Sequence, residues 1–315
     1  MFSAVLSPFR NTSGMARWIL VTGLLITAIF VVLAVFAPWI APYDFNQQKI
    51  DGVKMTKMQA PSSEHWFGTS DLFYDVLSRV IWGARTALQV VTLSVVLSVL
   101  VGVPLGLVSG FVGGWLDRIL VFLTDAMYAI PSLLLAIVFS FLLREALGGG
   151  VVAAALALTA VYIPQYFRVV RNTAVSAREA TYVEAARAIG AKKGTIMGRY
   201  LFGNVVQSVP VIGTLNAADA IGLLAALGFL GFGIQPNEAS EWGFDLSRAL
   251  DDSSAGIWWT GFFPGMAIVL LVTGLTLVGE GLNETVNPTL RKRRLRKVEL
   301  PPNEPTTAIV EGETR

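Results

Sequence analysis

The chain has 315 residues, of which 54% are hydrophobic and only 15% are charged, and its formal net charge is +2. Soluble domains carry about 25% charged residues, so this composition excludes an ordinary soluble domain. The absence of cysteine excludes disulfides and thiol catalysis, and the single histidine, His65, leaves no histidine cluster for a metal.

Long runs without charged residues indicate membrane spans. A helix needs roughly 20 apolar residues to cross the hydrocarbon core, and in lipid it must satisfy its backbone groups internally. Four runs carry no charge, and two more carry a single aspartate. The runs are 18–43, 86–116, 146–167 and 253–279, together with 119–143 (Asp125) and 200–237 (Asp219). The sequence therefore predicts an all-α integral membrane protein with about six transmembrane helices.

The distribution of Lys and Arg predicts the orientation of these spans. With the N-terminus in the cytoplasm, 17 of the 24 basic residues face the cytoplasm. Cytoplasmic loops carry such an excess of positive charge, so both termini are predicted to be cytoplasmic. The predicted divisions are a cytoplasmic tail (1–16), a first transmembrane helix (17–41), an external segment with an interfacial helix (42–85), a five-helix core (86–287) with a cytoplasmic loop (171–203), and a basic, disordered cytoplasmic tail (288–315).

The external segment ends in a helical pattern of apolar residues. Within 71–85, Leu72, Val76, Leu77 and Val80 recur at helical spacing. This pattern predicts an amphipathic helix that lies at the membrane interface before the second span.

The second span carries a small residue at every fourth position. These residues are Ser98, Gly102, Gly106, Gly110 and Gly114. This spacing lets helix backbones approach closely in lipid, so it predicts packing against a neighbouring helix, with the lining of a pore as the alternative.

Proline interrupts the later spans. Pro131 lies inside the predicted third span, where the lost backbone hydrogen bond predicts a kink. Pro164 lies in the fourth span and Pro210 in the fifth. The expected bounds of spans three, five and six are 116–143, 204–234 and 257–284.

The cytoplasmic loop between spans four and five contains a short helical segment. Tyr182, Ala185, Ala186 and Ile189 fall on one helix face, and alanine favours the helix. Gly190 and Gly194 are expected to end it. Spacing alone leaves two interpretations open: a helix gripped by a partner protein, or a helical loop with no partner.

This loop resembles the EAA signature of ATP-binding-cassette (ABC) importer permeases. Glu184-Ala185-Ala186 is followed, after three residues, by Gly190, as in that signature, although Gly203 stands where the family usually has proline. In that family the loop forms a coupling helix that docks into an ATPase subunit. The residues to which the resemblance assigns this contact are Tyr182, Glu184, Ala185, Ala186, Arg187 and Gly190.

Further motifs are similar to those of the dipeptide, oligopeptide and nickel branch of these permeases, and they recur in order over residues 17–290. Phe73 and Tyr74 depart from the branch, which usually has Gly-Arg there. The matching segments are 65–69, Asp71, 75–79, 83–85, 113–118, Asp125, 131–132, 229–236, 242–243 and 264–267.

The resemblance implies a translocation subunit of the bacterial inner (plasma) membrane that is not an enzyme and works by alternating access. The implied partners are a paralogous second permease subunit, two cytoplasmic ATPase subunits, an extracytoplasmic solute-binding protein and the lipid bilayer, without nucleic acid. ATP and magnesium would be bound by the ATPase subunits, so no cofactor is expected in this chain. Peptides are the default substrate, whether dipeptides or oligopeptides, with nickel and other small solutes left open.

A few polar residues inside the spans are candidates for the translocation path. Ionisable groups within spans usually face an interior or an aqueous cavity. Asp219 and Asn216 of span five are the candidates, although Asp219 could equally make an interhelical hydrogen bond. Asp125 is expected to cap a helix or pair with Arg118, and Glu280 and Glu284 are expected at the interface.

Three other functional classes fit the sequence less well. An ion-coupled secondary transporter would show an inverted repeat and paired intramembrane charges, which this sequence lacks. A membrane enzyme would need more catalytic side chains, and a structural scaffold would not need the coupling loop. The segment 190–195 lacks the order of a phosphate loop and a preceding strand, so a nucleotide site in this chain is excluded.

Overall fold

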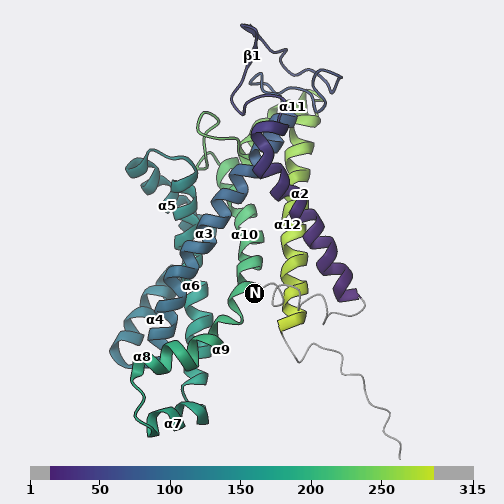
Figure 1. Ribbon diagram of the computed structural model, residues 1–315. Coiled ribbons are helices and arrows are strands. Elements are labelled where there is room, and N and C mark those ends of the chain that lie inside the picture. The colour runs from purple at the N-terminus through teal and green to yellow at the C-terminus, as the bar shows by residue number, and fades with distance from the viewer. Residues whose placement is uncertain (1–14, 287–315) are drawn as a thin grey trace, which may run out of the picture.

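The computed structural model describes residues 15–286, and this part of the chain is mostly helical (Figure 1). A short antiparallel hairpin pairs β1 (Lys49–Ile50) with β2 (Val53–Lys54). The long helices are α2 (Met15–Ile40), α3 (Val76–Val112), α4 (Gly114–Ala129), α5 (Ser132–Leu147), α6 (Gly150–Ala177), α10 (Val209–Phe229) and α12 (Trp259–Val286). The shorter elements are α7 (Thr181–Ala188), α8 (Lys193–Thr195), a π-helical turn (Ile196–Leu201), α9 (Phe202–Val206) and α11 (Trp242–Ser254).

The long helices run between two ends of the molecule. The hairpin and α11 lie at one end, and α7 and α8 lie at the opposite end (Figure 1). Five helices are long and apolar enough to cross a membrane, and the bent pair α4–α5 makes a sixth crossing if it counts as one span. The all-α membrane fold predicted from the sequence is therefore confirmed.

Exposed tryptophans mark both ends of α2. Trp18 and Trp39 are 73% and 75% exposed. At 1.5 Å per residue they lie about 30 Å apart along the helix axis, which is the thickness of the hydrocarbon core. Tryptophan is enriched at both membrane interfaces, so this spacing fits α2 as a span.

Small residues of α3 lie directly against α6. A Cβ atom on Gly102 would lie 2.8 Å from Cβ of Tyr166, and one on Gly106 would lie 2.6 Å from the carbonyl oxygen of Phe167. The predicted close helix packing is confirmed at these positions. Gly114 is an exception, because it adopts φ +72° at the start of α4 and faces open space.

The prediction of a separate interfacial helix at 71–85 is wrong. Residues from Val76 onward are the first turns of α3, and they continue without a break into the span. Asp75 fixes this start, because its Oδ2 accepts a hydrogen bond from the Ser78 amide at 2.8 Å. Val76 and Val80 are buried in the core of the chain instead of facing an interface.

The kink expected at Pro131 is a complete break. Helices α4 and α5 meet at 99°, and both Ile130 and Pro131 have extended backbone. Proline disfavours the helical conformation in the residue before it, so α4 ends there and α5 starts in a new direction.

Candidate functional site

The loop between α6 and α10 contains a short helix, α7, with one face turned toward the protein. Val183 and Ala186 are buried, whereas Ile189 is 80% exposed and Glu184 is also exposed. The sequence placed Ala186 on the same face as Ile189, but the structure turns Ala186 inward, because Val183 three residues earlier anchors that face. The outward side chains are those of Tyr182, Glu184, Ala185, Arg187 and Ile189.

Gly190 ends α7 as predicted. It adopts φ +79°, a left-handed conformation that glycine adopts without strain. Its amide donates to the Arg187 carbonyl at 2.9 Å, and the Ala191 amide donates to the Ala186 carbonyl at 3.0 Å. Gly194 was also expected to end this helix, but it lies inside α8.

Arginines connect the base of this loop to the membrane helices. Arg171 at the end of α6 makes two hydrogen bonds to the Asp117 carboxylate of α4, at 2.6 and 2.8 Å. Arg178, just before α7, donates from Nη1 to the Gly110 carbonyl of α3 at 3.2 Å. The segment that enters α7 is therefore tied to α3, α4 and α6 together.

Asp125 does not pair with Arg118, which corrects the sequence-based expectation. Its carboxylate accepts a hydrogen bond from Arg168 of α6 at 2.9 Å. The guanidinium of Arg168 also lies 4.2 Å from the ring centre of Tyr128. Both side chains of the pair are about half exposed. Arg168 and Asp125 are 43 residues apart in the sequence, so local spacing could not predict that they pair.

Asp219 lies at the middle of α10 and borders two cavities. Its Oδ2 accepts a hydrogen bond from the Tyr162 hydroxyl of α6 at 2.8 Å. A cavity of about 470 Å³ is lined by residues of α5, α10 and α12, and a cavity of about 310 Å³ lies at the α4–α5 break beside α6. Ser132 and Asp219 line both. The sequence analysis left two roles open for Asp219, an interhelical hydrogen bond and a position on the path. In the structure Asp219 makes the interhelical bond and also borders the cavities.

The other polar candidates lie elsewhere. Asn216 is buried within the packed face of α10 and lines neither cavity. Glu280 is exposed near the end of α12. The predicted basic tail (288–315) lies outside the described residues.

Motif residues at the end of the molecule that carries the hairpin, named the outer end after the predicted orientation, hold the segment between α2 and α3 onto the helices; we call this group the outer cluster. His65 Nδ1 lies 2.9 Å from the Asp75 carboxylate, which also caps α3. The indole of Trp259 in α12 donates to the Thr69 carbonyl at 3.1 Å. Trp242 of α11 likewise donates to the Val80 carbonyl of α3 at 3.1 Å. The branch motifs at 65–69, 75–79 and 242–243 therefore meet in space.

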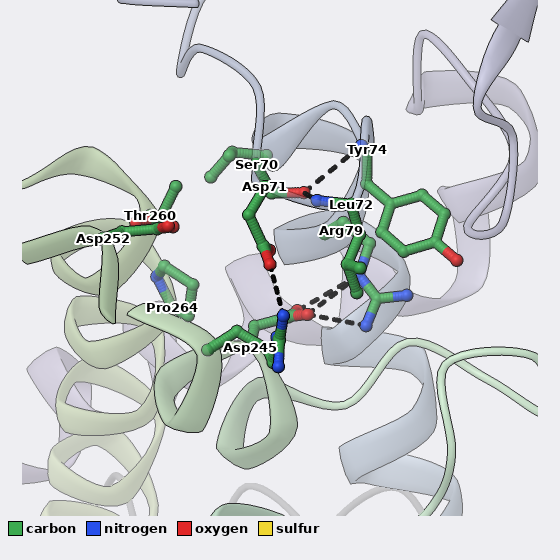
Figure 2. Close-up of a pocket in the computed structure, with 11 residues that line it drawn as sticks. Ser70, Asp71, Leu72, Tyr74, Arg79, Asp245, Asp252, Thr260 and Pro264 are labelled. Carbon is green, nitrogen blue, oxygen red and sulfur yellow. Dashed lines mark hydrogen bonds and ion pairs between the residues drawn. The ribbon is translucent and has the colours of Figure 1, made fainter. Parts of the chain in front are cut away.

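An ion pair between Arg79 and Asp245 lies inside this outer cluster (Figure 2). The guanidinium contacts the carboxylate through Nη2 at 2.7 Å and Nε at 3.1 Å, and it also donates to the Phe45 carbonyl at 3.1 Å. Burial raises the pKa of Asp245, and Arg79 opposes that rise. Next to this pair, Arg248 donates to Asp71 at 2.6 Å.

Glu241 caps α11 from a buried position. Its carboxylate accepts hydrogen bonds from the amides of Gly243 and Phe244, each at 2.8 Å. Burial raises the pKa of Glu241 to about 8, although these amides and Arg79 oppose the rise. The sequence analysis did not predict α11. The signal that could have indicated it is the acidic N-cap residue Glu241 directly before Trp242.

Glu238 connects the turn between α5 and α6 to the segment before α11, a contact that the sequence analysis did not predict. Its Oε2 accepts from the Gly150 amide at 3.0 Å and from the Gln235 amide at 3.1 Å, and Arg144 contacts it at 3.4 Å. This clamp ties the α5–α6 turn to the motif at 229–236. Among residues 15–286, no group of three or more His, Cys, Asp or Glu side chains could hold a metal ion.

Comparisons with known sequences cover most of the chain. Residues 102–292 match the family described as binding-protein-dependent transport system inner membrane component. Residues 16–61 match the N-terminal TM domain of oligopeptide transport permease C. The chain is 43% identical over 274 residues to the dipeptide transport system permease protein DppC of Escherichia coli K12, covering 86% of this chain and 89% of that protein. It is 37% identical over 271 residues to the glutathione transport system permease protein GsiD of Shigella flexneri, covering 86% of each.

A solved structure has the same fold. A chain of the MetNI methionine ABC transporter, in an inward facing conformation, aligns with a TM-score of 0.54 and 20% identity. The alignment covers 66% of this chain and 96% of that chain. At this identity the likeness shows the fold alone.

Proposed function

The chain belongs to the family of binding-protein-dependent transport system inner membrane components, and from that premise we propose that it forms half of the translocation path of a dipeptide importer. The family consists of non-catalytic, multi-pass membrane subunits of ABC transporters. The observation that carries the substrate class is the 43% identity to a dipeptide permease over 86% of the chain. The similar glutathione permease is named for another small peptide, which supports the same class.

The proposed assembly contains four kinds of subunit. This chain would pair with a paralogous permease in the bacterial inner membrane, with both termini in the cytoplasm. Two cytoplasmic ATPase subunits would bind ATP and magnesium, and an extracytoplasmic binding protein would deliver the peptide. Asp219 would line the path, because it borders both central cavities.

The proposed contact with the ATPase is the outward face of α7. Tyr182, Glu184, Ala185 and Arg187 would dock into the ATPase, with Ala186 anchoring the helix from behind and Gly190 ending it. Support comes from the geometry: α7 is a short helix with an exposed face, and Arg178 and Arg171 fasten its base to three membrane helices. A helix held in this way can transmit a push to the bundle.

Co-purification in mild detergent tests the assembly, and a paired substitution tests the contact. We expect Glu184→Lys with Gly190→Pro to lower ATP-driven dipeptide uptake at least about tenfold, the effect of losing about 1.4 kcal/mol of docking energy. The amount of this chain in the membrane should not change. Glu145→Lys makes the same charge reversal on an exposed residue of α5, far from α7, and should leave uptake unaffected.

Two results would overturn the proposal. One is full uptake by the Glu184→Lys, Gly190→Pro variant. The other is solute movement by the purified chain with no nucleotide-hydrolysing partner, which would favour an ion-coupled transporter.

A further inference from the structure

Asp219 is an intramembrane carboxylate without a basic partner in the part of the chain that the structure describes. The Tyr162 hydroxyl bonds its Oδ2 at 2.8 Å, and no Lys or Arg of residues 15–286 forms an ion pair with it. Its side chain is exposed and lines both cavities. Charged groups inside membranes are costly, and they normally pair with another charge or mark a substrate pathway.

The two cavities are lined mostly by apolar side chains, with a few neutral polar groups and no charged group besides Asp219. Ser132 and Thr276 line the larger cavity with Asp219, and Gln165 lines the smaller one. Such groups can hydrogen-bond a peptide amide, whereas the carboxylate can attract a positive charge. Because the Tyr162 hydroxyl bonds Oδ2, Oδ1 can accept a hydrogen bond from an incoming donor.

We propose that Asp219 binds the ammonium group of the solute at the middle of the path. This inference rests on the proposed function, because the free α-ammonium group is common to dipeptides and to glutathione. An ammonium group offers three hydrogen-bond donors and a full positive charge. In the low dielectric of a membrane cavity that charge is attracted to a carboxylate far more strongly than in water.

Uptake by the complete complex in proteoliposomes gives the first test. Asp219→Asn keeps an oxygen acceptor for Tyr162 but removes the charge, and we expect uptake of labelled alanyl-alanine to fall at least about tenfold. Tyr162→Phe removes the hydrogen bond but keeps the charge, and should stay within about threefold of the unmodified complex. Glu280→Gln, which removes a carboxylate from α12 away from the cavities, is the matched control.

A reporter cysteine gives a second test in which Asp219 stays intact. The chain has no cysteine, and a Cβ on Gly222, one turn along α10 in the same cavity, meets nothing within 4 Å. In Gly222→Cys, a cationic methanethiosulfonate should label this chain at least about tenfold faster than an anionic reagent of similar size. Adding Asp219→Asn should abolish that preference.

The outcomes separate this inference from the function on which it rests. No ATP-driven dipeptide uptake by the unmodified complex would overturn the proposed function. Normal uptake with unimpaired Asp219→Asn, or equal labelling of the Gly222→Cys variant by both reagents, would overturn only the role of Asp219. Equal losses in Asp219→Asn and Tyr162→Phe would assign the carboxylate to helix packing instead.

Discussion

Replacing Asp245 tests whether the outer cluster depends on its buried ion pair. The side chain of Arg79 is 3% exposed and that of Asp245 is 15% exposed. Asp245→Asn would leave the guanidinium buried without a charged partner, with only neutral oxygen acceptors such as the Phe45 carbonyl and with the Tyr74 ring beside it. Removing one member of a buried pair costs roughly 3–5 kcal/mol, so we expect a loss of that size in the free energy of unfolding.

A second ion pair in the same chain provides the control. Arg168 and Asp125 are 49% and 55% exposed, and exposed pairs contribute about 0–1 kcal/mol. Asp125→Asn should therefore cost at least about 2 kcal/mol less than Asp245→Asn. The measurement is equilibrium unfolding of the purified chain in mixed micelles of increasing denaturing detergent.

A double substitution checks the cause of the loss. Burial, together with repulsion from Asp71, raises the pKa of Asp245 in spite of Arg79, so this carboxylate is costly to bury in its charged form. Replacing both charges with apolar groups, as in Arg79→Met with Asp245→Leu, should therefore recover part of the stability lost in Asp245→Asn. Equal costs for Asp245→Asn and Asp125→Asn, or strictly additive losses in the double variant, would refute the reasoning.

Two further predictions concern packing and pH. Gly106→Leu should lower the free energy of unfolding by about 1–3 kcal/mol, because the new Cβ would meet a backbone carbonyl of α6 that cannot move away. Thermal unfolding is the measurement, and Gly222→Ala, at a position with open space around it, is the control. Burial raises the pKa of Glu241 from its usual 4.5 to about 8, so its contribution to stability is complete below about pH 4.5 and is lost as the pH rises through about 8. Glu241→Gln should flatten the fall in melting temperature between pH 5 and 9, and an unchanged slope would count against this assignment.

The membrane spans could be predicted from the sequence because lipid constrains composition directly. A charge-free run of sufficient length has few alternatives to a helix, and the spacing of Gly102 and Gly106 similarly requires a close neighbour. The sequence could not show that this neighbour is α6. The spacing of residues describes the surface of one helix, whereas a contact depends on the positions of two helices. The same limit applies to α7, where periodicity defined a face but could not show that Ala186 turns inward.

The outer cluster was missed for a different reason. Arg79 and Asp245 are 166 residues apart in the chain, and neither stands in a local pattern that indicates its partner. Only the folding of α11 back onto α3 brings them together, and that contact depends on the indole of Trp242 reaching the Val80 carbonyl. Proline placed the break at Pro131 correctly, but its 99° angle depends on where α5 packs.

The contacts around α7 indicate which parts of the subunit would move together. Arg178 fastens the entry to α7 onto α3, and Arg171 joins α6 to α4 through Asp117. The glycines of α3 pack directly against the backbone of α6 without a gap. A displacement of α7 would therefore move α3 and α6 together as one rigid body. The break at Pro131 lies where this body meets α5, beside the cavities that Asp219 lines. An ATPase that binds α7 more tightly in one arrangement would then shift the balance between two shapes of that cavity, by no more than its difference in affinity.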